Sequence, residues 1–423
     1  PGSGVVGGAG TAADPYRIEG WSIVHAGHVG VEIRNTTAHV VVRDLYLPGD
    51  DGLPFGSVRC AQPGSVCDGS VAIQLRNASN VRVERVRALH DTIGVLVDGG
   101  SSRVAVDRMD LRSTIHPRVE PATTRSSVGI LVRDASDVAF SNVTIANRNL
   151  PVVLARSADV SLRDSTVQGA GTSLPAVQLF DTERVSLVGN SFVGASVAAV
   201  GMNRDLRLAL NTAQASRHLF APLSDGFVDG LDACGNVVTG ATSVSGALHL
   251  THVRNASVRG NVLRDGVAGI VIDNSENLTL TSNEISGSSE YALFADAPGV
   301  SASGNAISGN GLGSFFYQSA DLRGNWWGDA SGPSGLGSGS GDLVDAAPGV
   351  AVDVSGWLSS PPSLSVDCGV PARAAAPPVV SSVGAQASVG LEASVRVRVP
   401  GASPVALVVD DAVVVAPPPV VLP

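Results

Sequence analysis

An asparagine recurs at regular intervals through the second half of the chain, and the residues around it recur with it. It occupies positions 236, 261, 283, 305 and 325. A self-similar period of about 20–25 residues is typical of a solenoid, in which each repeat forms one coil of a stack. Followed back toward the N-terminus, the recurring position is occupied by Asp44, Arg85, Arg108, Asn142, Asp164, Asn190, Asn211, Asn236, Asn261, Asn283, Asn305 and Asn325.

Residues 267–287 show what one coil contains. A short apolar segment at 269–272 is followed by a polar turn, an alternating segment at 278–281, Asn283 and a brief apolar segment around Ile285. These are strand patterns with no helical period between them. The fold is therefore predicted to be all-β: a right-handed parallel β-helix of about 12 coils. Apolar side chains such as Leu278 and Leu280 should alternate into its core.

The asparagines of the recurring position are expected to stack at a corner of the coil. Asparagine tolerates the left-handed backbone region that a tight corner requires. Its side-chain amide can also hydrogen-bond to the same residue one coil away. The sequence therefore predicts a corner ladder made of Asn190, Asn211, Asn236, Asn261, Asn283, Asn305 and Asn325.

Composition excludes several function classes. The net charge is −10, which argues against a nucleic-acid partner. All 28 basic residues are arginine, so Schiff-base lysines and the lysine of a phosphate-binding loop are absent. No apolar run approaches the ~18 residues that span a bilayer. Because the chain begins at Pro1 without a signal peptide, we expect a processed form or a fragment.

The sequence divides into four parts. Residues 1–30 are glycine-rich and are predicted to cap the open end of the solenoid, which residues 31–358 form. Residues 359–378 are rich in proline and alanine and are predicted to form a linker. Residues 379–423 return to alternating apolar segments and resemble part of an immunoglobulin-like sandwich. Half a sandwich leaves apolar faces and strand edges open, and three arrangements would cover them: a chain that continues past residue 423, packing on its own β-helix, or completion by a neighbouring subunit. Of these we expect self-association, with head-to-tail strand addition as one form of it.

Extra residues interrupt the period in four places, at 48–70, 113–127, 168–175 and 212–245. All four begin shortly after the recurring position, so they should leave the solenoid at one corner. Insertions that share a corner stack into one wall, which is where solenoids commonly bind a ligand. Tolerated surface loops are the alternative interpretation.

The four cysteines suggest two disulfides and an extracellular setting. We expect Cys60 to pair with Cys67 within a small loop. Cys234 would then pair with Cys368, which requires the linker to run back along the rod.

Five N-x-Ser/Thr sequons occur, and four of them lie beside the exposed turn that precedes the alternating segment. We expect these four to accept glycans: Asn35, Asn77, Asn255 and Asn277. Asn142, the fifth, lies in the inner corner column and is expected to stay unmodified.

Candidate metal and catalytic residues are few. His249 and His252 are three residues apart on a strand, so His249 should face outward and His252 inward, which separates them as metal ligands. Asp225, Asp229 and Asp232 match the spacing of neither an EF-hand nor a glycine-rich nonapeptide repeat. No cluster of acidic and basic residues recurs at equal coil positions, and aromatic platforms for sugars are scarce. We therefore expect no metal, no cofactor and no catalytic residue.

Two motifs carry a family resemblance. The opening DPYRIEGW and the closing NWWG…SGP flank the repeated coils. With them the chain resembles the NosD-like family of right-handed parallel β-helix surface and periplasmic proteins, over roughly residues 11–358. The resemblance implies a secreted, cell-surface or periplasmic protein, and it carries no catalytic residue because the motifs are structural.

The function expected from these features is a non-catalytic, secreted structural or adhesive role at a cell surface, including a subunit of a filament or surface layer, with surface glycans among its partners. Two alternatives remain open. One is a polysaccharide lyase or hydrolase that uses the insertion wall as its cleft. The other is a periplasmic metal-handling protein of the NosD type.

Overall fold

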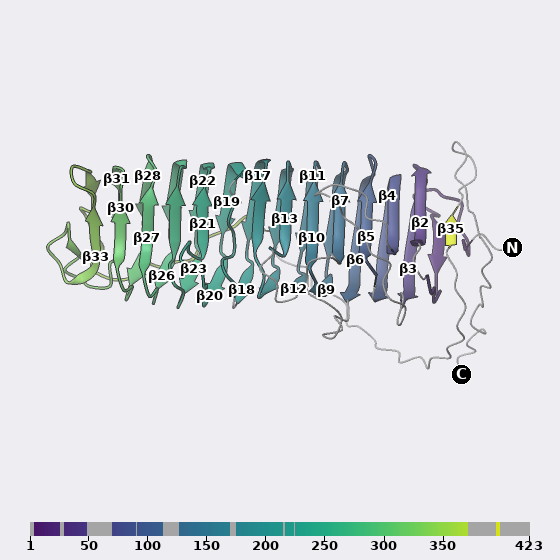
Figure 1. Ribbon diagram of the computed structural model, residues 1–423, viewed down its shortest axis with the longest axis horizontal. Coiled ribbons are helices and arrows are strands. Elements are labelled where there is room, and N and C mark those ends of the chain that lie inside the picture. The colour runs from purple at the N-terminus through teal and green to yellow at the C-terminus, as the bar shows by residue number, and fades with distance from the viewer. Residues whose placement is uncertain are drawn as a thin grey trace.

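The computed structural model describes residues 4–25, 29–48, 70–89, 91–112, 127–169, 175–214, 216–223 and 225–370, together with the backbone of a short strand at 395–397. All regular secondary structure in these residues is β. The chain winds into a right-handed parallel β-helix of about 11 turns, which forms the long rod of Figure 1. The predicted fold class is confirmed, with about one coil fewer than expected.

Three stacked ladders of parallel strands make the walls of the rod. The first ladder opens each coil and pairs β2 through β33 in order. Phe220 bridges the gap between β16 and β21. Its strands are β2 (Val29–Thr36), the first part of β4 (Val71–Leu89), β5 (Ile93–Asp98), β7 (Val128–Arg133), β10 (Leu150–Ala155), β13 (Val177–Phe180), β16 (Val197–Val200), β21 (Leu248–Thr251), β24 (Ile270–Asp273), β27 (Tyr291–Asp296), β30 (Gly313–Phe316) and β33 (Gly341–Ala346), with β32 (Pro333–Gly335) beside the last.

Within each coil, the strand of the second ladder comes after the first turn, and the strand of the third ladder comes after the next corner. The second contains β1 (Tyr16–Glu19), β3 (Val40–Leu47), the rest of β4, β6 (Ser102–Arg112), β8 (Ser136–Ser141), β11 (Ala158–Arg163), β14 (Glu183–Val188), β17 (Met202–Ala209), β19 (Phe227–Cys234), β22 (Val253–Arg259), β25 (Glu276–Thr281), β28 (Val300–Ser303), β31 (Ala320–Asp321) and β34 (Val352–Asp353). The third contains the ends of β3, β4 and β6, then β9 (Thr144–Arg148), β12 (Thr166–Gly169), β15 (Ser191–Val193), β18 (Thr212–Gln214), β20 (Val237–Thr239), β23 (Val262–Arg264), β26 (Glu284–Ser286) and β29 (Ala306–Ser308).

The core is a set of apolar columns, because each inward side chain stacks on its counterpart in the next coil. Two neighbouring columns in the second ladder are Val138–Val160–Val185 and Phe140–Leu162–Leu187. Each of these side chains is at most 2% exposed. Fully burying one such side chain stabilises the fold by about 1.5–3 kcal/mol. A single coil could not exclude water from this interior, so the stack is the stable unit.

The recurring position of the sequence mixes two structural positions. Residues Asp44, Arg85, Arg108, Asn142 and Asp164 have φ between 48° and 56°. In the later coils this left-handed position is taken by the residue before each asparagine: Gly189, Leu210, Gly235, Gly260, Ser282, Gly304 and Gly324. The expectation that the ladder asparagines adopt the left-handed conformation is therefore wrong. They follow it by one residue, and glycine commonly takes the left-handed position because it pays no Cβ penalty there.

The seven asparagines form a continuous buried ladder, each at most 1% exposed. In every step the Oδ1 of one asparagine accepts both the backbone N–H and the side-chain amide of the asparagine one coil earlier, at 2.8–3.0 Å. Each side-chain amide also donates to a carbonyl of the second ladder. Ser165 extends the ladder by one step, since its N–H donates to Asn190.

One of the four expected insertions is a coil rather than a loop. Residues 212–245 contain β18, β19 and β20, which pair with the coils on both sides. Most of 48–70, 113–127 and 168–175 lies outside the described residues.

The expected immunoglobulin-like part at 379–423 also lies outside the described residues, apart from β35 (Val395–Val397). The backbone of β35 pairs in parallel with β2, with Val31 opposite Val395 (Figure 1). The backbone of β35 thus covers the edge of the first ladder at the N-terminal end of the rod. Self-association through residues 379–423 stays a prediction.

Candidate functional site

Aromatic side chains gather on the outside of the first ladder in its last coils. The outward positions of β21, β24, β27 and β30 are in register, so they form a row along the rod: His249, Val271, Phe294 and Phe315, with Asp345 of β33 next. Inward neighbours such as Leu293 are buried, whereas Phe294 and Phe315 are partly exposed. This row is the start of a solvent-facing aromatic surface.

Tyr291 and Tyr317 complete what we call the aromatic face, with Phe294 and Phe315. The ring of Phe294 stacks on that of Phe315, with centroids 6.3 Å apart and an interplanar angle of 20°. Tyr317 meets both rings edge-on at 5.8 and 5.0 Å. Tyr291 packs on Phe294 at 5.3 Å. Tyr317 is 47% exposed, so the cluster is open to solvent. A cluster of this kind marks a binding surface more often than isolated exposed residues do.

A histidine–aspartate pair borders the aromatic face on its N-terminal side. His249 Nε2 lies 3.1 Å from Asp273 Oδ2, and both side chains are partly exposed. Burial lowers the pKa of nearby His218 to about 4, and the charges of Arg217 and His249 act in the same direction. His218 is therefore neutral near pH 7 and adds no positive charge to this border.

The electrostatic surroundings of the aromatic face are acidic. Residues 265–370 carry 12 aspartates and glutamates and a single basic residue, Arg323. Residues 1–264 carry 23 acidic and 24 basic residues and are nearly neutral. The net negative charge of residues 1–370 thus falls within residues 265–370, which include the coils that present the aromatic side chains.

The aromatic face is not among the sites predicted from the sequence, because aromatic content is low and the four residues belong to two different repeats. The register of the repeats could have predicted it. Phe294 and Phe315 are one repeat apart, and each follows an inward-facing residue of the apolar segment. Two aromatics at the same outward position of consecutive repeats must stack.

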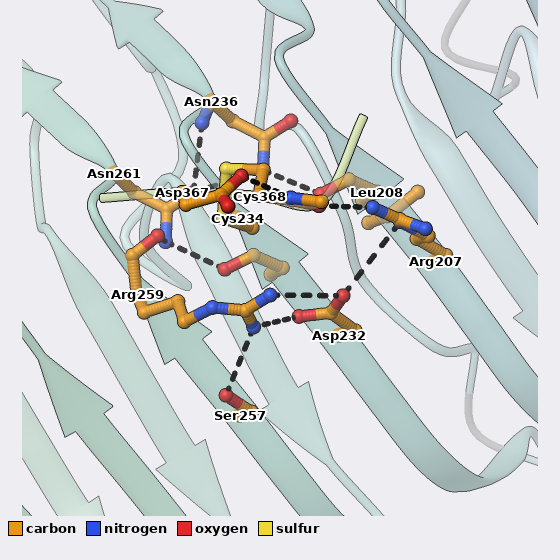
Figure 2. The surroundings of a disulfide bond; sticks show 12 residues. Arg207, Leu208, Asp232, Cys234, Asn236, Ser257, Arg259, Asn261, Asp367 and Cys368 are labelled. Atoms are coloured by element: carbon orange, nitrogen blue, oxygen red, sulfur yellow. Dashed lines mark hydrogen bonds and ion pairs between the residues drawn. A yellow bond between two sulfur atoms is a disulfide. The ribbon is translucent and has the colours of Figure 1, made fainter. Parts of the chain in front are cut away.

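A second feature lies on the outside of the second ladder, where the chain beyond the last coil runs back along the rod. Residues 359–370, which we call the strap, carry Cys368 to Cys234, and the structure joins them in a disulfide with Cα atoms 5.7 Å apart (Figure 2). Val366 and Val370 of the strap pack beside this bond. Val188 and Ala209 point outward yet are at most 5% exposed, since they belong to the same cluster. The expected Cys60–Cys67 pair lies outside the described residues.

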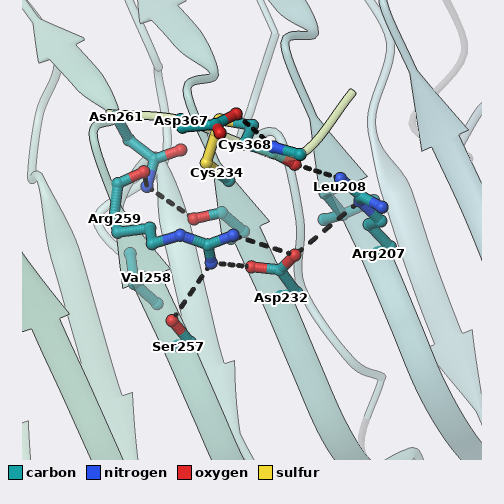
Figure 3. Close-up of polar contacts among 12 residues, drawn as sticks. Arg207, Leu208, Asp232, Cys234, Ser257, Val258, Arg259, Asn261, Asp367 and Cys368 are labelled. Atoms are coloured by element: carbon teal, nitrogen blue, oxygen red, sulfur yellow. Dashed lines mark hydrogen bonds and ion pairs between the residues drawn. A yellow bond between two sulfur atoms is a disulfide. The ribbon is translucent and has the colours of Figure 1, made fainter. Parts of the chain in front are cut away.

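Two glycines of the left-handed column make room for the strap. A Cβ on Gly235 would come within 2.9 Å of the Cys368 sulfur, and one on Gly260 within 2.8 Å of Val366. The charged groups below the strap are paired with each other. Arg259 contacts both carboxylate oxygens of Asp232, and Arg207 donates to the carbonyl of Cys368 (Figure 3).

The aspartates considered for calcium are dispersed. Asp232 pairs with arginines, Asp229 accepts a hydrogen bond from Asn255 at 2.7 Å, and Asp225 is exposed. His252 lies at a bend with φ of 53°, not on the inward face as expected. Among the described residues there is no group of three or more His, Cys, Asp or Glu side chains that could hold a metal ion.

A buried charged cluster lies at the corner between the third and the first ladder. His25 contacts Asp91, and both side chains are fully buried. Arg148 is 0% exposed and donates to the backbone carbonyls of Asp91 and Arg112. Burial lowers the pKa of Arg148 to about 10. These groups are buried and present no surface to a ligand. Their role is structural: they form hydrogen bonds with buried polar groups at this corner.

The four sequon asparagines are exposed and left-handed, with φ between 45° and 58°. They stack in pairs: Asn77 donates to Asn35 at 3.0 Å, and Asn277 donates to Asn255 at 2.6 Å. Asn142 is half-buried and donates to Asp107 at 2.7 Å. It occupies the left-handed column, not the buried ladder in which the sequence placed it.

Comparison with known proteins was consistent with this architecture. The family described as "Periplasmic copper-binding protein (NosD)" matches residues 227–332. Over these residues the chain is similar to that family, and the structure shows a parallel β-helix there. No curated protein matches the sequence. No described residues form a helix long and apolar enough to cross a membrane.

Several solved structures resemble the chain. The Dettilon tailspike protein (gp208) is 13% identical with a TM-score of 0.40, and the match covers 77% of this chain and 62% of the tailspike. This chain therefore spans less than two thirds of the tailspike. PfbA, a surface adhesin of Streptococcus pneumoniae, is 11% identical with a TM-score of 0.45 and coverages of 76% and 84%. A PL6 alginate lyase in complex with a trisaccharide is 10% identical with a TM-score of 0.34 and coverages of 71% and 79%.

Proposed function

We propose that the protein is a non-catalytic β-helix located outside the cytoplasm, with a structural or adhesive role at a cell surface, and that it binds a polysaccharide through the aromatic face. The observation that carries the proposal is the cluster of Tyr291, Phe294, Phe315 and Tyr317 on the outside of the first ladder. These are four of only 17 Phe, Trp and Tyr residues in the chain.

The chemistry of the aromatic face suits sugar rings. One face of a pyranose presents C–H groups that pack on an aromatic ring, where the electron-rich ring face favours them. Its hydroxyl groups then need hydrogen-bond partners, and Asp273 and Asp296 are within the same surface. Because coils repeat at about 4.8 Å, a ladder of rings presents repeated contacts to a repeating polymer.

Two further observations support a location outside the cytoplasm. The Cys234–Cys368 disulfide fits an oxidising compartment, since disulfides are rare in reducing ones. The family matched over residues 227–332 is described as periplasmic. A periplasmic or extracellular site satisfies both.

The test is a binding assay with the full-length protein against a panel of immobilised polysaccharides. Phe294→Ala combined with Phe315→Ala should abolish binding to whichever polysaccharide is retained. Val237→Ala is the matched control, because Val237 is an apolar side chain 38% exposed on the third ladder. Equal binding by the double variant and the control would overturn the proposal.

A polysaccharide-active enzyme is the second candidate, favoured by the His249–Asp273 pair beside the aromatic face. Such a pair can exchange a proton with a bound sugar. The same panel, analysed for new reducing ends or unsaturated products, separates the two functions. Product formation that His249→Ala abolishes would establish the enzyme and exclude a purely adhesive role.

The metal-handling alternative has less support, although the matched family is described as copper-binding. Within residues 227–332, the side chain of His249 is partly exposed and pairs with Asp273, and His252 lies at the bend between β21 and β22. We therefore place function on the aromatic face.

A further inference from the structure

We propose that the polysaccharide bound by the aromatic face carries amino groups, so that the ligand is cationic. This inference rests on the proposed function and specifies its ligand class. It follows from how carboxylates are arranged around the four aromatic rings.

Each ring of the stacked pair has a carboxylate beside it on the outward face of the ladder. Asp296 follows Phe294 by two residues in β27, so both side chains point outward. Asp345 of β33 is directly opposite Phe315 of β30. Asp273 is opposite Asp296 in the neighbouring coil. Asp273 and Asp296 therefore form a column beside the column of rings. Asp345 lies at the end of the ring column, next to Phe315.

This arrangement recognises a cation in two ways. The electron-rich face of an aromatic ring attracts an ammonium group. A neighbouring carboxylate adds a charge-assisted hydrogen bond. A sugar ring stacked on Phe294 or Phe315 would place its amino group within reach of the adjacent carboxylate, and the next residue of the polymer would repeat the contact.

The same surface disfavours an anionic polymer, because it carries carboxylates and lacks basic side chains. No Arg, Lys or His occurs between residues 265 and 322, so the coils bearing Phe294 and Phe315 offer no cation to a uronate or sulfate group. Asp273 and Asp296 would repel such a group, because charges closer than the Debye length of about 8 Å at physiological ionic strength are only partly screened.

A second copy of the chain is a weaker fit to this surface. Residues 1–264 are nearly neutral, and many of their arginines are already paired, as in Arg156 with Asp134 and Arg184 with Asp159. Residues 1–264 therefore offer no excess of positive charge to the acidic surface of a second copy. A polymer with an ammonium group on every sugar offers such an excess.

The experiment uses isothermal titration calorimetry with the full-length protein and compares oligosaccharides of different charge, at a mildly acidic pH at which the amines of glucosamine are protonated. The probes are a glucosamine hexamer, the N-acetylglucosamine hexamer of the same linkage, and an alginate oligomer of similar length. The glucosamine hexamer should bind at least about tenfold more tightly than its N-acetylated counterpart, and alginate should not bind. Raising salt from about 50 to about 500 mM should weaken the cationic ligand and leave the neutral one nearly unchanged.

Two variants separate specific recognition from general attraction to an acidic protein. Asp296→Asn combined with Asp345→Asn should weaken the glucosamine hexamer about tenfold or more. The control replaces Glu276, an exposed carboxylate of the second ladder in the same acidic region, with glutamine. Glu276→Gln should have little effect on the affinity for the glucosamine hexamer. If each charge removed costs as much affinity in this control as in the double variant, the inference is overturned.

The remaining outcomes distinguish this inference from the function beneath it. If the N-acetylated hexamer or alginate binds as tightly as the glucosamine hexamer, and does so through Phe294 and Phe315, the ligand class is wrong and the proposed function stands. If no polysaccharide binds, both are wrong.

Discussion

Asn261 reaches from one coil to the next, where its side-chain amide donates to Oδ1 of Asn283 at 2.9 Å. The backbone N–H of Asn261 donates to the same oxygen at 3.0 Å. Its own Oδ1 accepts the equivalent pair from Asn236. Every rung is thus donor and acceptor at once, and truncating one rung leaves buried groups unpaired on both sides.

Asn261→Ala should therefore destabilise the rod by about 3–5 kcal/mol, because several buried polar groups lose their partners at about 1–3 kcal/mol each. Chemical denaturation measures the loss. The control is Asn255→Gly, which removes an exposed asparagine at φ of 56° and keeps the backbone relaxed. Its free energy of unfolding should change by less than about 1 kcal/mol. Similar losses in the two variants would contradict the ladder.

Leu280→Asp tests the register of the second ladder. Leu280 is 1% exposed in an apolar column, so an aspartate there would be a buried charge without a partner, at a cost of several kcal/mol. The neighbouring Thr279 is exposed, and Thr279→Asp should be nearly silent. Thermal unfolding of both variants decides it, and equal shifts in Tm would mean that the two side chains do not face opposite ways.

Breaking the Cys234–Cys368 bond should release the strap and leave the coils intact. A disulfide of this kind stabilises by about 2–4 kcal/mol. Limited proteolysis of Cys234→Ser/Cys368→Ser should show faster cleavage within residues 359–370, with strand content unchanged by circular dichroism. Treating this double variant with a reductant controls for Cys60 and Cys67. An uncleaved strap in the double variant would show that packing of Val366 and Val370 holds it without the bond.

Acidification should destabilise the protein through His218. Its pKa in the folded protein is about 4, below the ordinary value of 6.5. Between these values the unfolded chain binds the proton more readily, so stability falls as pH drops from about 6.5 to about 4. At about 1.4 kcal/mol per pKa unit, the loss is about 3 kcal/mol at most. His218→Gln should lose correspondingly less stability over this range, and parallel pH profiles for the two proteins would refute the assignment.

Glycan occupancy of stacked sequons should be mutually exclusive. Asn277 and Asn255 are hydrogen-bonded neighbours in adjacent coils, which are about 4.8 Å apart. Two branched glycans cannot leave from amides that close. Intact mass after expression in a glycosylating host should show at most one glycan on this pair. Asn255→Gln should raise occupancy at Asn277, and a doubly glycosylated Asn255–Asn277 pair would contradict the prediction.

The period of the sequence was sufficient to determine the fold class, because a short repeat with strand patterns can bury its apolar face only by stacking. The alternation of Leu278 and Leu280 likewise identified the inward side. Both are local patterns, repeated often enough to tolerate errors in any one coil.

Only the tertiary structure decided matters that depend on exact register or on residues far apart. The shift between Asp164 and Asn190 in the recurring position is a single step along the chain, and a periodicity cannot resolve so small a shift when coil lengths vary. The aromatic face exists because Phe294 and Phe315 stack across coils. Val188 and Ala209 are buried on an outward face because the strap returns over them. Such contacts arise from where the chain passes in space, and nothing local to these residues encodes it.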